Sequence, residues 1–367
     1  MIVNNKTGGK NMKERNKRNN SKKENAITLI ALVVTIVVLL ILAGVSINLV
    51  LGDNGIVNKA QEAEKSSKTA SKKEKMQFIL DDYEIQKEIE KISLEDYLKN
   101  NKILYDKNEE NNNITVEYEG SSYTINRDNY EITDIKEVEK KQEVSLVESV
   151  TSDNYGDDVI GYEANGISEW QIFYNDGNNI YLISKDFADI SKISEEQPQL
   201  TKGNNYRVRA GDFTGLYTDE SQTKGRFEKA LNDKDVWNKY YVNSLADYAI
   251  GGPTLEMIIN SYNQKYNLNM SCAFDSNGYV IDYNDNTSKK LNSDDSLYVI
   301  KDTTKSWGYW IATRAKDNIT ASLYIVRSNG QIQADACWKD TAATRPIVCL
   351  KNSVKAAQYT SAWVLNQ

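Results

Sequence analysis

The sequence from Lys22 to Leu51, KKENAITLIALVVTIVVLLILAGVSINLVL, joins a basic segment directly to a long apolar run. No charged residue occurs from Ile27 to Leu51, a stretch of 25 residues. A helix of that length is about 38 Å long, which exceeds the roughly 30 Å hydrocarbon core of a bilayer. Because backbone polar groups in lipid must bond to one another, the run is predicted to be a membrane helix.

Charge is distributed unevenly along the 367 residues. The first 26 residues carry eight Lys or Arg and two Glu, so their net charge is +6; the whole chain carries −7, which leaves −13 on the rest. A basic flank before the apolar run predicts a single-pass protein with a cytoplasmic N-terminus and an extracellular bulk. The acidic bulk argues against nucleic-acid binding, because contact with phosphates needs a basic face.

The sequence contains no histidine and three cysteines, Cys272, Cys337 and Cys349. The lack of His excludes Ser-His-Asp and Cys-His catalysis and zinc sites built on His. Three thiols allow at most one internal disulfide, for which Cys272–Cys337 is a candidate, and Cys349 in PIVCL is expected to be a small buried residue. No catalytic residue, metal or cofactor is predicted, and the protein is not expected to be an enzyme.

The apolar run is too long for a removed secretory signal, whose core spans about 7–15 residues before a small-residue cleavage site. The sequence at its end, AGVSINLVLGDNG, is also a poor cleavage site. Two interpretations remain open, a signal anchor that only tethers the protein and a helix that packs against copies of itself.

The segment NAITLIALVVTIVVLLILAGVSINLVL resembles the cleavage and methylation segment of type IV prepilins and of type II secretion pseudopilins, including pilin-like proteins of clostridial type. The shared features are a basic leader, a small residue and an ITLIALV opening of the apolar helix. The resemblance implies that a prepilin peptidase cuts between Ala26 and Ile27, and that Ile27 becomes the N-methylated terminus. Retention of the leader on an uncleaved anchor is the alternative.

Two positions differ from the family pattern. The family usually has Gly before the cut, where this chain has Ala26, which is also small. The family usually has Glu at the fifth mature position, where this chain has Ala31, and that carboxylate pairs with the terminal amine of a neighbouring subunit. A buried charge without a partner is costly, so Ala31 leaves open whether filaments assemble efficiently.

Residues 52–137 are predicted to form a helix extension and a small antiparallel sheet, the order found in pilin-like proteins. Apolar residues recur at helical spacing between Ile56 and Ile92, which indicates one buried face or, alternatively, a charged stalk helix. Ser93 and Asp96 stand at capping-box spacing and predict a short helix. The alternation in ITVEYEGSSYTINRDNYEITDI predicts three strands with turns at EGSS and NRDN.

Residues 138–150 are interpreted as a linker or a connecting strand, and residues 151–367 as a separate extracellular domain. NDGNN between WQIFY and IYLIS predicts a hairpin, and SNG in SLYIVRSNGQIQ predicts another. Pro253 is expected at the first position of a helix that buries Leu255, Ile258, Ile259 and Tyr262. Four tryptophans near the C-terminus are expected in the core, unless a pair is exposed as a partner surface: Trp307, Trp310, Trp338 and Trp363.

The strands YWIATRA, LYIVRSNGQIQ and TRPIVCLK resemble the C-terminal end of C-type-lectin-like surface domains of the sulfatase-modifying type. The resemblance implies a compact α+β domain with twisted hairpins and long loops, and no activity is carried over with it. Arg345 is expected to be a buried structural residue that bonds to a carboxylate or to carbonyl groups. The Asp/Asn-rich run from Asp275 to Asp295 is a solvated loop or a Ca²⁺ site without EF-hand spacing.

The sequence therefore predicts an α+β chain with a leader at 1–26 and an assembly helix at 27–51. The leading hypothesis is a pilin-like or pseudopilin subunit of a surface filament that displays an extracellular binding domain. The alternative is a monomeric, membrane-anchored adhesion module. Small residues at Ala43, Gly44 and Ser46 are expected to allow close helix contact. The predicted partners are the membrane, a prepilin peptidase, other pilin-like subunits and an extracellular ligand.

Overall fold

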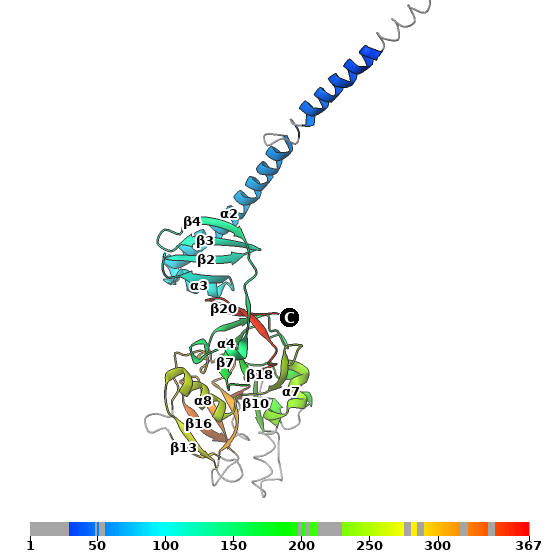
Figure 1. The fold of residues 1–367 in the computed structure, drawn as a ribbon. Coiled ribbons are helices and arrows are strands. Elements are labelled where there is room, and N and C mark those ends of the chain that lie inside the picture. Colours follow the sequence, from blue (N-terminus) through cyan, green and yellow to red (C-terminus); the bar gives the residue numbers. More distant parts are fainter. Residues whose placement is uncertain are drawn as a thin grey trace, which may run out of the picture. The chain divides into compact units, whose positions relative to one another are not determined.

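The fold is α+β, with an apolar N-terminal helix followed by a long second helix and several sheets (Figure 1). A computed structural model describes residues 29–47, 50, 56–196, 200–202, 206–210, 230–274, 280–284, 290–315, 322–336 and 342–366. Contacts divide the chain into two units, Met1–Asp82 and Tyr83–Gln367. Each unit is described by itself below.

The second helix, α2, runs from Ile56 to Glu90 and contains neither Gly nor Pro. Its abundance of Ala, Glu, Lys and Gln favours a helix even where the side chains are solvated. The helix ends at Lys91, which has the left-handed φ of 56° that commonly closes a helix. Within the second unit, the Tyr83 ring packs against Tyr97 and Tyr130, with ring centroids 5.5 and 5.2 Å apart. The last turns of α2 therefore have a buried face, so the helix is not a free stalk there.

The short helix predicted at Ser93 is present as α3, Leu94–Asn100. The Ser93 hydroxyl accepts from the Asp96 backbone N–H at 3.1 Å, which confirms the cap. The small sheet has four antiparallel strands in the order β1-β2-β3-β4, one more than predicted. The strands are β1 (Leu104–Asn108), β2 (Asn113–Tyr118), β3 (Ser121–Asn126) and β4 (Ile132–Glu137).

The predicted turn at EGSS joins β2 to β3. Glu119 and Gly120 both have positive φ, 45° and 72°, as a tight hairpin turn between twisted strands requires. Ile114 and Val116 on β2 are fully buried, and their alternation with more exposed neighbours gives the sheet one apolar face.

Two larger sheets follow in the C-terminal part of the second unit. The first has the order β11-β18-β8-β7-β6-β20-β19-β5, and the second has the order β12-β13-β14-β17-β10-β9 with β15 beside β14 and β16 beside β15. The strands of the first sheet are β5 (Glu143–Ser145), β6 (Asp158–Ile160), β7 (Trp170–Asn175), β8 (Ile180–Ser184), β11 (Ala246–Ile250), β18 (Ile347–Leu350), β19 (Lys355–Gln358) and β20 (Ala362–Leu365).

The strands of the second sheet are β9 (Leu200–Lys202), β10 (Arg207–Ala210), β12 (Ser271–Phe274), β13 (Val280–Asn284), β14 (Gly308–Ala315), β15 (Ser322–Arg327), β16 (Ile332–Ala336) and β17 (Ala342–Ala343). The helices of this part are α4 (Leu146–Ser149), α5 (Ser191–Glu196), α7 (Lys234–Tyr241) and α8 (Leu255–Tyr266), with a 3₁₀ turn at Ser152–Asn154.

The segment expected to be a linker, 138–150, largely belongs to this C-terminal part. Its strand β5 pairs antiparallel with β19, in the register Lys355↔Ser145 and Ala357↔Glu143. α4 follows at once, and its Leu146 is buried in the core. The connection to the small sheet is therefore shorter than a linker over 138–150, because the end of this segment pairs with β19 as a strand.

The predicted hairpins are present in both C-terminal sheets. β7 pairs with β8 around Gly177, whose φ is 90°, and β15 pairs with β16 around Gly330, whose φ is 83°. The helix α8 also forms, but Thr254 caps it, and Pro253 lies two residues before the first helical residue, Leu255, and not at the first position as predicted. The Thr254 hydroxyl accepts from the Met257 N–H at 3.1 Å, and this cap sets the helix start.

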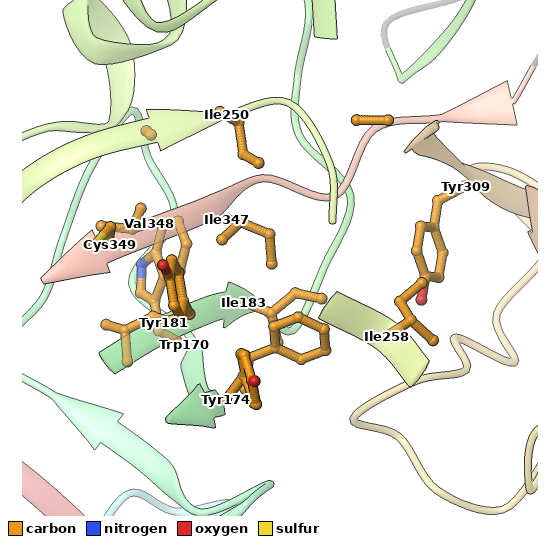
Figure 2. Packing of buried hydrophobic residues seen from close by; sticks show 14 of the residues in the cluster. Trp170, Tyr174, Tyr181, Ile183, Ile250, Ile258, Tyr309, Ile347, Val348 and Cys349 are labelled. Carbon is orange, nitrogen blue, oxygen red and sulfur yellow. The ribbon is translucent and has the colours of Figure 1, made fainter. Parts of the chain in front are cut away.

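One continuous apolar core lies among the C-terminal sheets and helices (Figure 2). Trp170 on β7 and Ile347 on β18 are fully buried there, and Tyr309 on β14 is 1% exposed. The predicted face of α8 contributes Leu255, Ile258, Ile259 and Tyr262, all of them buried. This core joins strands of both larger sheets with α7 and α8 into one packed body.

Candidate functional site

The apolar helix Leu29–Ile47 is the first candidate site, and it is long and apolar enough to cross a membrane. Its 19 residues correspond to about 28 Å of helix, close to the thickness of a bilayer core. None of the residues in this span is buried against the rest of the chain. Its Leu, Ile and Val side chains are exposed on every side, so lipid or another protein must cover them.

The predicted assembly residues Ala31, Ala43, Gly44 and Ser46 all lie in this helix. A Cβ built on Gly44 meets nothing within 4 Å, so the space beside it is open to a neighbour. The Thr35 hydroxyl bonds back to the Ala31 carbonyl, which satisfies a polar side chain inside an apolar surface. The predicted cleavage bond, Ala26–Ile27, lies outside the described residues.

The helix α2, whose course is seen in Figure 1, carries a second uncovered apolar surface. This surface is the stripe of Phe78, Ile85 and Ile89. These side chains are 65%, 60% and 73% exposed. At about 100° per residue, spacings of 7 and 11 residues place the three within about 20° of one line on the helix. Met76 and Leu80, which are buried, point to the opposite side. A charged stalk helix would not need two apolar faces.

The junction between the small sheet and the C-terminal sheets is built by the turn from β19 to β20. β1 is the edge strand of the small sheet, and the Tyr105 N–H donates to the Ser361 hydroxyl at 3.1 Å. The Ser361 N–H donates back to the Tyr105 carbonyl, and the Thr360 N–H donates to the Asp106 carboxylate at 3.0 Å. An otherwise open sheet edge is thereby covered.

Arg345 is fully buried and structural, as predicted. Its guanidinium donates to the backbone carbonyls of Ser184 and Leu297, each at 2.6 Å, and to that of Ser296 at 3.2 Å. It also lies over the Tyr309 ring, 5.6 Å from the centroid. Burial lowers the pKa of this guanidinium, and the aromatic ring and the carbonyl groups hold it in place. These contacts use its hydrogen-bonding capacity inside the core rather than at a site.

The Asp/Asn-rich run is only partly described. Asp294 pairs with Lys301 at 2.6 Å, and Asp295 pairs with Lys265 at 2.9 Å, while Asp275 and Asp285 lie outside the described residues. Within the described part of the chain, no group of three His, Cys, Asp or Glu side chains is placed to hold a metal. The structure therefore leaves the choice between a solvated loop and a Ca²⁺ site as a prediction.

The cysteines and tryptophans are distributed between core and surface. Cys349 is buried as predicted, and burial raises the pKa of its thiol to about 11. Cys272 is a free, half-buried thiol, and its candidate partner Cys337 lies outside the described residues, as does Trp338. Trp310 and Trp363 are fully buried, whereas Trp307 is half-buried with the Arg327 guanidinium 5.0 Å from its ring.

Comparison of the chain with protein-family models, with curated proteins and with solved structures finds no match. The candidate sites therefore stand on their own geometry. Sequence reasoning missed β1, because LYDKN has a single buried residue and shows no clear alternation, although its partner β2 follows it directly. It also missed the contact of β1 with the β19–β20 turn, because Ser361 lies 256 residues from Tyr105. Sequence reasoning also gave no role to Lys99, Lys102 and Lys185, which lie close to this junction.

Proposed function

We propose that this protein is a pilin-like or pseudopilin subunit of a surface filament, anchored in the membrane before assembly. A prepilin peptidase cuts between Ala26 and Ile27, and Ile27 becomes the methylated start of the assembly helix. The helix then leaves the bilayer and packs against copies of itself and other pilin-like subunits. The C-terminal sheets, of a C-type-lectin-like kind, are displayed outside the cell to bind an extracellular ligand.

The observation that supports this proposal best is the exposed stripe of Phe78, Ile85 and Ile89 on α2. A tether needs one apolar surface, the membrane helix, and gains nothing from a second one in water. Exposed apolar surface along a helix is stabilised when another helix covers it. A filament of parallel subunits would cover the stripe with a neighbouring chain, and it would cover the helix Leu29–Ile47 in the same way.

The helix Leu29–Ile47 has the properties that such an exchange requires. It contains no charge, so its transfer from lipid into a protein bundle desolvates no ion. Ala43, Gly44 and Ser46 are small, and small residues allow close approach of helix backbones in apolar surroundings. The basic leader at 1–26 sets the cytoplasmic side of the N-terminus.

Cysteine crosslinking in cells tests the proposal against the tether. Ile85→Cys places a thiol on the stripe, and Glu84→Cys places one on the neighbouring, equally exposed position away from it. A filament predicts oxidised dimers for Ile85→Cys and far fewer for Glu84→Cys, with the unsubstituted chain as the background for the native thiols. Chains that stay monomeric in both variants, while surface filaments are being made, would support the anchored adhesion module instead.

A further inference from the structure

Within the unit Tyr83–Gln367, a hollow of about 210 Å³ lies between the small sheet and the C-terminal sheets. We call it the junction hollow; its walls come from residues of 99–104, 158–160, 168–170, 185 and 361–362. The end of α3 and the start of β1 form one side, and β6, the start of β7 and the start of β20 form the other. A ligand in the junction hollow would therefore contact both the small sheet side and the C-terminal sheets.

The junction hollow concentrates positive charge in an acidic body. Its charged residues are Lys99, Lys102, Lys185, Asp158 and Glu169, three ammonium groups against two carboxylates. The chain after the leader carries −13, so a local excess of cations is not what the composition predicts. A local excess of ammonium groups attracts an anion, and a concave surface focuses this attraction.

The ion pairs inside the hollow leave two lysines weakly held. Lys185 contacts both oxygens of Asp158, at 3.1 and 3.2 Å, and so compensates that carboxylate. Lys99 lies 3.9 Å from the same carboxylate, beyond hydrogen-bond length. Lys102 pairs with Glu169 at 3.2 Å, but both side chains are about half exposed or more, 62% and 49%, and such pairs are weak. Lys99 and Lys102 are thus the ammonium groups available to a ligand.

The uncharged part of the lining adds hydroxyl, amide and apolar groups. Ser168, Ser361 and Asn100 supply neutral donors and acceptors, and Val159 and Ile160 supply an apolar wall. The two carboxylates accept hydrogen bonds from ligand O–H groups even while they are paired, since each has several acceptor positions. A ligand that fits this lining carries one negative charge, several hydroxyl groups and some apolar surface.

We propose that the junction hollow binds an acidic sugar, a monosaccharide-sized unit with one carboxylate and several hydroxyl groups. The ligand carboxylate lies between Lys99 and Lys102, and its hydroxyl groups bond to Asp158 and Ser361. A zwitterion such as an amino acid fits less well, because Lys185 already neutralises Asp158 and a ligand ammonium would meet Lys99 and Lys102 nearby.

This inference rests on the proposed display function only for its place at the cell surface. The hollow belongs to the purified chain and does not need a filament. If filaments form but the junction hollow binds no ligand, only this inference is wrong. If the hollow binds its ligand but no filaments form, only the proposed function is wrong.

Ligand-observed NMR on the full chain in detergent micelles measures the binding directly. The probes are glucuronate, glucose, acetate and glycine. Glucuronate is expected to bind with a dissociation constant on the order of 1 mM, as befits a ligand of about 13 non-hydrogen atoms. Glucose, acetate and glycine each lack one required group and are expected to bind at least about tenfold more weakly, the loss expected for one charge-assisted contact or its equivalent.

Substitutions locate the site. Lys99→Gln and Lys102→Gln are each expected to weaken glucuronate binding about tenfold. Lys136→Gln removes the same charge from an exposed pair on β4, outside the hollow, and is expected to change nothing. Equal binding of glucose or of acetate, no binding of glucuronate, or equal affinity in all three variants would each overturn the proposal. Thermal unfolding of the variants shows whether a lost affinity reflects a lost fold.

Discussion

Tyr105 and Ser361, 256 positions apart in the sequence, exchange two hydrogen bonds: the Tyr105 N–H donates to the Ser361 hydroxyl at 3.1 Å, and the Ser361 N–H donates to the Tyr105 carbonyl at 3.3 Å. The first bond is buried. This bond covers the outer edge of β1 and joins the small sheet to the turn between β19 and β20. The unit from Tyr83 to Gln367 therefore contains both the small sheet and the C-terminal sheets.

Ser361→Ala is expected to lower the free energy of unfolding of the whole unit. The Tyr105 N–H would be left buried without its acceptor, which costs about 1–3 kcal/mol. Thr360→Ala removes a similar bond, from the Lys107 N–H to the Thr360 hydroxyl, but at an exposed position where water replaces it. Urea unfolding of both variants measures the difference, and an equal loss in the two would contradict the role of the buried bond.

Arg345→Met is expected to destabilise the C-terminal sheets by about 3 kcal/mol or more, because it removes the donor to two buried carbonyl groups and to one partly buried carbonyl group. Arg345→Lys is expected to recover little, since one ammonium cannot reach carbonyls on both sides of the planar guanidinium. Lys290→Met, at an exposed position, is the control for loss of a positive charge. Thermal unfolding followed by tryptophan fluorescence reports the change, and a midpoint for Arg345→Met equal to that of Lys290→Met would contradict the assignment.

Glu95 links α3 to the small sheet and should make stability depend on pH. Burial raises the pKa of its carboxyl, but the backbone N–H, Lys107 and Arg127 lower it further, and the net result is a pKa below the ordinary 4.5. A carboxyl with a depressed folded pKa stabilises the fold above its unfolded pKa, and this stabilisation is lost as pH falls through the folded pKa.

The stability advantage of the unsubstituted chain over Glu95→Gln should therefore be full at pH 7 and shrink below about pH 4.5. Urea unfolding at pH 7 and at pH 3 checks this prediction. A difference between the two chains that stays constant across this range would mean that the Lys107 and Arg127 contacts, at 3.2 and 2.5 Å, add no stability through the charge of Glu95.

Gly44→Leu is expected to reduce filament yield while membrane insertion stays intact. A Cβ at Gly44 meets nothing within 4 Å, and the helix around it is not buried against the chain, so an effect on assembly is expected to come from a neighbouring helix. A larger residue keeps backbones apart, and it makes the helix more apolar, which favours insertion. Sheared filaments and the membrane fraction are quantified in parallel. An unchanged filament yield would show that this face of the helix is not an assembly contact.

Sequence reasoning found the elements that are encoded locally. The uncharged run after Ala26 predicts a membrane-length helix, Ser93 predicts the cap of α3, and the glycine-containing turns predict the hairpins around Gly177 and Gly330. Each of these depends on residues within a few positions of one another. The apolar helix and the hairpins could therefore be predicted without knowledge of the rest of the chain.

The features that sequence reasoning missed depend on distant partners. β5 is a strand because it pairs with β19. The outer edge of β1 is covered because Ser361 accepts a hydrogen bond from Tyr105. Lys99 and Lys185, which are far apart in the sequence, line the same hollow only in the folded chain. No local sequence pattern indicates such long-range contacts. In the sequence, Lys99 cannot be told apart from a solvated surface lysine.

The N-terminal residue of the surface-exposed protein distinguishes a processed filament subunit from a membrane tether. Peptide mass spectrometry of the N-terminus of the form recovered from the cell surface gives the mature start and its modification. The account predicts a chain that begins at Ile27 with one methyl group on its amine. A surface form that still carries residues 1–26, or that begins at any other residue, would contradict it and leave a membrane tether.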